Sequence, residues 1–132
     1  MPEILLITSL NSKRWILPKG WLMAGLSAAE SAAREAFEEA GVAGKIGARP
    51  VGSYHYLKER KDGGGMPCRV DVFSLQVTAQ MEDWPEKGAR EIEWLPADQA
   101  AMRVAEPGLR DLLRNFNKPQ KNKQPLAAKR TG

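Results

Sequence analysis

Three glutamates carry the clearest chemical signal in this sequence. Glu35, Glu38 and Glu39 are spaced i, i+3 and i+4, so on a helix they share one face, where their carboxylates repel one another. A solvated helix usually scatters such charges or pairs them with lysines, whereas here Arg34 alone faces the three. Clustered oxygen ligands suit a hard divalent cation, Mg²⁺ or Mn²⁺, rather than zinc. The spacing therefore predicts a metal site, with an acidic surface helix as the alternative.

The helix that would carry these glutamates has both of its ends marked. Ser27 and Glu30 have the spacing of a capping box, and Gly41 stands where a left-handed C-terminal cap belongs. The sequence between them is rich in alanine, the best helix former, and the alanines share one side with Phe37. The pattern predicts a helix that begins after Ser27 and ends before Gly41.

The wider spacing around this helix resembles the Nudix box, whose form is G-x5-E-x7-R-E-U-x-E-E-x-G-U with U an aliphatic residue. The matching positions are Gly20, Arg34, Glu35, Glu38, Glu39, Gly41 and Val42. Ala36 is a small substitute for the aliphatic residue, and Leu26 stands where the pattern has its first Glu. Seven matches at fixed offsets make the motif specific.

The likeness extends beyond the box and covers most of residues 4–116. Residues 15–21 (WILPKGW), 52–54, 83–84 and 90–94 are similar to landmarks of a bacterial Nudix group related to diphosphoinositol polyphosphate and dinucleoside polyphosphate phosphohydrolases. The resemblance implies an α/β/α sandwich with a mixed central sheet. It also implies metal-dependent hydrolysis of a diphosphate linkage in a small molecule, either of the nucleoside-diphosphate type or highly phosphorylated.

The same resemblance implies which residues bind the metal. Glu35 and Glu39 would be ligands, with Glu38 a third, and the ion would be Mg²⁺ or Mn²⁺. The metal would neutralise the diphosphate charge, position the attacking water and lower its pKa. One of these carboxylates, or Glu82 or Glu86 from a later loop, would take the proton of the water.

Residues around the metal are expected to orient it and to hold the substrate. Arg34 is expected to pair with Glu38 and fix its rotamer, and Gly20 to let the backbone come close to the metal. Trp21 and Trp84 could stack on a base, although core packing is the preferred interpretation. The substrate-binding candidates are Lys19, Gly20, Arg69 and Arg90.

Leu26 is the position at which the sequence departs from the box. A carboxylate there could interact with the helix dipole or with a metal-bound water, and leucine can do neither. We predict an active enzyme that needs millimolar metal, in which Leu26→Glu lowers that requirement. Alternatively, Leu26 packs under the loop at Trp21 or Met23. The departure also keeps open a Nudix module that senses nucleotides without turnover.

Composition and charge divide the chain into two parts. A length of 132 residues, with 42% hydrophobic and 27% charged residues, is typical of one globular domain. The basic residues of the last sixteen positions are Lys118, Lys121, Lys123, Lys129 and Arg130. Subtracting these five from the net charge of +4 leaves −1 for residues 1–116. We therefore expect a Nudix hydrolase domain at 1–116 and a basic, disordered tail at 117–132. Binding of nucleic acid through this tail is an alternative, and not the expected one.

Several broad classes are disfavoured by the sequence. Cys68 is the single cysteine, so there is no disulfide framework, and no apolar run is long enough for a membrane span. The start does not have the form of a signal peptide. A cytoplasmic protein without a membrane partner is expected.

The elements that must position the site follow an α+β pattern. Strands are expected at 3–9, 15–17, 45–56, 68–78 and 91–95, the glutamate helix lies between the second and third of these, and helices start at Pro96 and Pro107. Relatives usually carry another strand ahead of Ile4. The N-terminal strand is therefore expected to be truncated. The sheet could then be short by one strand, another chain could fill the gap in a homodimer, or the start site could be misassigned.

Overall fold

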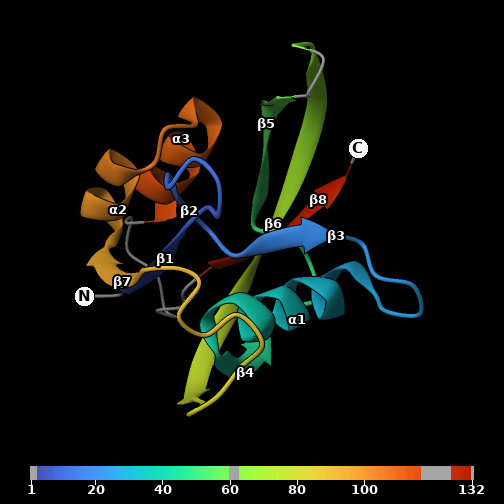
Figure 1. Ribbon diagram of the computed structural model, residues 1–132, viewed down its shortest axis with the longest axis vertical. Helices are drawn as coiled ribbons and strands as arrows, with labels where there is room; N and C mark the ends of the chain where they lie inside the picture. The colour runs from blue at the N-terminus through green and yellow to red at the C-terminus, as the bar shows by residue number, and fades with distance from the viewer. Residues whose placement is uncertain (1–2, 60–62, 117–125, 132) are drawn as a thin grey trace.

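A computed structural model describes residues 3–59, 63–116 and 126–131. The elements occur in the order β1 (Glu3–Thr8), β2 (Trp15–Ile16), β3 (Lys19–Trp21), α1 (Ala28–Ala40), β4 (Val42–Ile46), β5 (Gly52–Glu59), β6 (Gly65–Gln80), β7 (Ile92–Pro96), α2 (Ala97–Arg103), α3 (Pro107–Phe116) and β8 (Leu126–Thr131) (Figure 1). The predicted α+β class is confirmed.

The strand β6 joins most of the other strands into a mixed sheet. Its first half pairs antiparallel with β5, and its second half pairs antiparallel with β4. Along the other edge of β6 lies β8, which is antiparallel to β6 and parallel to β3. A separate antiparallel sheet has the order β2-β1-β7.

Two hydrophobic clusters fill the spaces between the strands and the helices on either side of them. Leu5 and Phe73 pack with the alanine face of α1, whereas Leu6 and Val72 pack with residues of α2 and α3. Neighbouring residues of β1 and β6 thus point to opposite clusters, as the period of two in a strand requires. One helix covers one side of the strands and two helices cover the other (Figure 1).

The predicted ends of α1 are confirmed. The Glu30 N–H donates to Ser27 Oγ at 3.1 Å, and the Ser27 N–H donates to Glu30 Oε1 at 2.8 Å, which completes the capping box. Gly41 has φ +71° at the C-terminal cap. A Cβ at Gly41 would lie 2.2 Å from the Trp84 ring, so this glycine also lets the loop at residues 82–91 pack against the end of α1.

The strands of the structure differ from the expectation in two places. Residues 45–56 form parts of two strands, β4 and β5, because Gly47 and Pro50 lie in the loop between them. No strand was expected between residue 17 and the glutamate helix, where Pro18 and Gly20 disfavour one, yet residues 19–21 form β3. This strand has no apolar alternation of its own, so only its pairing in the fold defines it.

The C-terminal segment also departs from the expectation of disorder. Residues 117–125 lie outside the described part of the chain, but Leu126–Thr131 forms β8 within the mixed sheet. The strand begins with a short apolar segment, Leu126–Ala128, which follows a polar, proline-containing stretch. Because the composition of residues 117–132 is mostly polar and basic, it suggested a solvated tail. The boundary between a domain at 1–116 and a separate tail stays a prediction.

Candidate active site

Glu35 and Glu39 form a carboxyl pair one helical turn apart on α1. Their side chains are joined by a hydrogen bond, and Glu39 is buried, with only 4% of its surface exposed. Glu39 Oε1 also accepts a hydrogen bond from the backbone N–H of Lys19 at 3.1 Å. The first residue of β3 is thereby connected to the glutamate helix.

Burial gives Glu39 an unusual affinity for a proton. Desolvation, the hydrogen bond that protonated Glu39 donates to the Glu35 carboxylate and the negative charge of Glu35 together raise the pKa of Glu39 from 4.5 to about 9, against opposing contributions from Arg90 and the Lys19 backbone. Without a cation, Glu39 therefore holds a proton at neutral pH. A divalent cation beside the pair would favour both carboxylates and displace that proton.

Gly20 in β3 lies directly against this pair. A Cβ at Gly20 would be 2.3 Å from Glu35 Cδ and 2.4 Å from Glu35 Oε1, so no residue with a side chain fits there without displacing Glu35. The absence of a side chain thus allows the β3 backbone to line the carboxyl pair.

Arg34 and Glu38 do not form the ion pair that was expected between them. Glu38 is half-buried, and its backbone carbonyl accepts the Glu86 N–H at 3.0 Å. Arg34 is exposed and forms no ion pair with Glu38, both of which belong to the described residues. Within residues 3–59, 63–116 and 126–131, no three His, Cys, Asp or Glu side chains are grouped to hold a metal. The role of Glu38 as a third ligand, and of Arg34 in catalysis, stays a prediction.

Arg90, a predicted substrate contact, lies largely inside the protein. Its Nε is 2.9 Å from Glu86 Oε1, its Nη1 donates to the Thr8 carbonyl at 3.1 Å, and its side chain is 10% exposed. Its positive charge also lowers the pKa of Glu39. This geometry favours a role in positioning the loop at residues 82–91 over direct contact with a phosphate. The i, i+4 spacing of Glu86 and Arg90 in the sequence could have indicated this ion pair.

Lys19, Trp21, Tyr56 and Lys58 form a surface of alternating ammonium and aromatic groups, here called the aromatic–lysine surface. Lys19 Nζ lies 4.1 Å from the Tyr56 ring centroid, and Lys58 Nζ lies 5.6 Å from that of Trp21. Trp21 is 39% exposed, so the expectation that it packs in the core is wrong. The side-chain contacts of Tyr56 and Lys58 on β5 with Lys19 and Trp21 were not predicted, because only the fold brings them together.

The remaining predicted residues lie elsewhere. Arg69, on β6, is exposed and forms an ion pair with Asp71 at 2.9 Å. Its part in substrate binding stays a prediction. Trp84 packs against Gly41, as core packing predicted.

Leu26 lines a hollow of about 340 Å³ on the outer side of α1. Its neighbours there are Glu30, Ala33, Arg34, Phe37 and Ile46. On the helical wheel the α1 members of this set point away from the side that carries Glu35 and Glu39. The geometry therefore gives no support to a contact between position 26 and a metal-bound water, and it places Leu26 near Arg34 rather than in the core.

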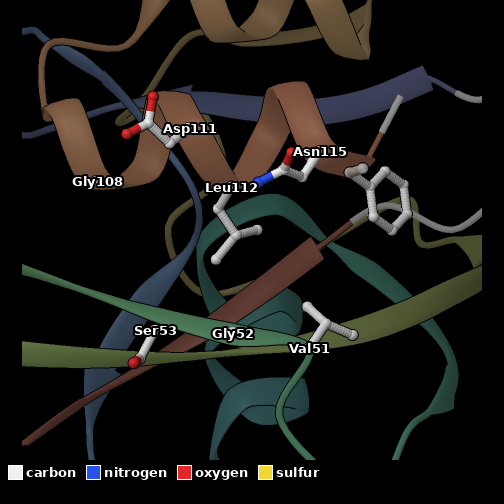
Figure 2. A pocket seen from close by; sticks show the side chains of 8 residues that line it. Val51, Gly52, Ser53, Gly108, Asp111, Leu112 and Asn115 are labelled. Atoms are coloured by element: carbon white, nitrogen blue, oxygen red, sulfur yellow. The ribbon is translucent and has the colours of Figure 1, made fainter. Parts of the chain in front are cut away.

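A second hollow, of about 690 Å³, lies between α3 and the beginning of β5. Figure 2 shows Leu112 of α3 directed toward the strands and Val51 at the lower edge of the same space. Because α3 packs on the side of the strands opposite to α1, this hollow does not include the carboxyl pair.

Comparison with known families defines the class of this protein. Residues 2–116 match the family described as NUDIX domain, and the chain belongs to that family. The resemblance inferred from the box is thereby confirmed.

Relatives within the family include enzymes from plants and mammals. Nudix hydrolase 12, mitochondrial, from Arabidopsis thaliana is 37% identical over 103 residues, covering 74% of this chain and 50% of the relative. Nudix hydrolase 16, mitochondrial, from the same plant is 31% identical over 134 residues, covering 98% of this chain and 74% of the relative. Diphosphoinositol polyphosphate phosphohydrolase 3-beta from Bos taurus is 37% identical over 101 residues, covering 74% of this chain and 57% of the relative. The chain spans about half the length of Nudix hydrolase 12 and of the Bos taurus phosphohydrolase.

The helices of the described segments include none that is long and apolar enough to span a membrane. The names of two relatives above place those proteins in mitochondria. The cytoplasmic location of this chain stays a prediction.

Proposed function

We propose that this protein is a metal-dependent Nudix diphosphohydrolase. Its substrate would be a small, highly phosphorylated molecule, either a dinucleoside polyphosphate or a diphosphoinositol polyphosphate. The observation that carries the proposal is the Glu35–Glu39 pair held against Gly20 within a matched Nudix domain. The name of the Bos taurus relative supports the inositol class.

The donor set fits a hard divalent cation. Glu35 and Glu39 supply oxygen ligands only, and the raised pKa of Glu39 supports the proposal because a cation beside the pair would take the place of the proton. These two residues would hold Mg²⁺ or Mn²⁺, and a bound ion would supply charge neutralisation and a more acidic water. A dimeric assembly stays a prediction.

The proton acceptor is proposed among the α1 carboxylates. Glu86 Oε1 is engaged by Arg90, which lowers its value as a base. Glu82 is exposed, and its backbone carbonyl, rather than its carboxylate, binds Lys87. The acids of the later loop are therefore weaker candidates than the carboxyl groups beside Gly20.

The aromatic–lysine surface is proposed to attract the phosphates. Lys19 has its backbone on Glu39 and its ammonium group over Tyr56, so it links the carboxyl pair to this surface. Lys58 adds a second ammonium group next to Trp21. Two cations at the edge of the metal site would raise the local concentration of a polyanionic substrate.

A substrate panel tests the proposal. The purified chain would be assayed with Mg²⁺ or Mn²⁺ against a dinucleoside polyphosphate, a diphosphoinositol polyphosphate and a nucleoside diphosphate sugar. We expect turnover of at least one of the first two, faster than of the sugar nucleotide. Binding of these compounds without turnover under every metal condition would instead support a sensing module. Leu26, the feature that raised that alternative, lies away from the carboxyl pair.

A further inference from the structure

The strand β8 lies in a place from which it can control the candidate active site. It is inserted between β3 and β6 in the mixed sheet, and its backbone lies beside α1 (Figure 1). The chemistry proposed above assigns no role to this segment, which is separated from α3 by residues 117–125.

Two of the three residues of β3 contact the carboxyl pair. The Lys19 N–H donates to Glu39 Oε1 at 3.1 Å, and the α-carbon of Gly20 lies against the Glu35 carboxyl group. A displacement of β3 by about 1 Å would break the hydrogen bond, because N–H···O bonds weaken rapidly beyond roughly 3.2 Å. The position of β3 therefore sets the geometry of the pair.

In the strands that the structure describes, β8 is the only neighbour of β3. Gly20 is in register with Lys129, and Lys19 with Ala128. On its opposite edge, β8 pairs with β6 from Leu126 opposite Ser74 to Thr131 opposite Arg69. Adjacent strands lie about 4.8 Å apart, so β3 is held roughly 10 Å from β6 and cannot pair with it while β8 is in place.

We infer that β8 is a positioning element of the candidate active site. By joining β3 to the long strand β6, it fixes the backbone of Lys19 and Gly20 against Glu35 and Glu39. Loss of β8 would leave an unfilled strand position beside β6 and would free β3 to move away from α1. The inference rests on the proposed function only for its consequence in turnover, because the coupling of the strands can be measured without substrate or metal.

Amide hydrogen exchange of the unmodified chain tests this coupling. If β8 holds β3, the amides of Lys19–Trp21 and Leu126–Thr131 open in one event and show similar protection. The amides of α1 can be protected more strongly, because the helix has its own hydrogen bonds. Strong protection in β3 combined with free exchange in β8 would show that β3 is held by something else, and would overturn the inference.

A pair of variants at one position tests the direction of the effect. Ala128→Pro removes a backbone N–H from β8 and interrupts its ladder, whereas Ala128→Thr keeps the N–H and suits a strand. We expect exchange of the Lys19–Trp21 amides to be at least about tenfold faster in the proline variant than in the threonine variant, with α1 unchanged. Equal exchange in the two variants would contradict the inference. Should the proline variant fail to fold, the exchange of the unmodified chain decides alone.

Metal binding provides a readout that mere loss of stability would not move. Mn²⁺ titrated into folded samples of the two variants, followed by electron paramagnetic resonance, should bind several-fold more weakly to Ala128→Pro. Equal Mn²⁺ affinity of Ala128→Pro and Ala128→Thr would show that β8 does not position the site, and would contradict the inference. A chain without any hydrolytic activity would reject the proposed function but leave the exchange result standing, so the two failures are distinguishable.

Discussion

In the metal-free chain, the carboxyl group of Glu39 resembles an amide in charge and shape, because its pKa of about 9 keeps it protonated at neutral pH. A glutamine at this position can therefore accept the Lys19 N–H in the same way. What a glutamine cannot supply is the negative charge that a cation requires. Fold and function can thus be separated at this one residue.

We predict that Glu39→Gln reduces turnover by on the order of a hundredfold or more, with a melting temperature close to that of the wild type. Initial rates with saturating Mg²⁺ and a thermal unfolding curve measure the two effects. Glu38→Gln is the matched control on the same helix and should lose less activity, since Glu38 is outside the carboxyl pair. A Glu39→Gln rate near that of the wild type would refute the assignment.

Leu26→Glu is predicted to leave the metal requirement unchanged, unlike the expectation from the box alone. The new carboxylate would face Arg34 across the same hollow and lie near the N-terminus of α1, which changes stability by at most about 1 kcal/mol. Metal titration of the activity and urea unfolding measure both quantities. Leu26→Gln, which has the same length without the charge, isolates the effect of the ion pair. A clear drop in the metal concentration for half-maximal rate would show that position 26 reaches the site.

Among the elements, α1 could be predicted and β3 could not, and the difference is physical. The signals for α1 are local: Ser27 and Glu30 cap one end, Gly41 caps the other, and the alanine face lies between them. The strand β3 exists through its pairing with β8 and through the contact of Lys19 with Glu39. A pattern in residues 18–20 alone cannot show partners that are so far away in the sequence.

The end of α1 offers a test at the scale of elements. Gly41→Ala should destabilise the fold by about 3 kcal/mol or more, because it adds the strain of a left-handed alanine to a clash with Trp84. Gly25→Ala is the matched control: its φ is +81° but its Cβ would meet no atom within 4 Å, so strain of about 1–2 kcal/mol is expected. Urea unfolding of both variants gives the difference. Equal losses would mean that the Trp84 loop moves aside without cost.

For the molecule as a whole, the buried proton makes stability depend on pH. The pKa of Glu39 is raised from 4.5 in a model peptide to about 9 in the folded chain. Between these two pH values the folded state therefore binds the proton more tightly than the unfolded state does. The stability gained in this way is fully present below the pKa of Glu39 in the unfolded chain and is lost as the pH rises through its pKa in the folded chain. The free energy of unfolding falls by at most about 1.4 kcal/mol per pH unit.

The urea midpoint of the metal-free protein should therefore fall between about pH 6 and about pH 8.5. Glu39→Gln should remove most of this slope, and saturating Mg²⁺ should reduce it, because the cation favours the carboxylate. A midpoint that rises over this range would contradict the burial of a protonated Glu39.

The candidate site could be predicted from the sequence only in part. The helix spacing was enough to group Glu35 with Glu39, because it fixes which side chains share a face. It was not enough to show that Glu39 is buried and Glu38 only half-buried, since that depends on what packs against each side of α1. Arg90 shows the same limit, because its second partner, the Thr8 carbonyl, reaches it only through the tertiary fold.

The pairing of β3 with β8 has a consequence for how the chain is made. During synthesis on the ribosome, β3 emerges more than a hundred residues before the strand beside which it will lie. Closing so long a loop has a high entropic cost and slows folding. The glutamate helix can form early from its own local signals, but the backbone of Lys19 and Gly20 reaches its final neighbours only once residues 126–131 have been added. The nascent chain therefore carries its carboxylates some time before it carries a finished site.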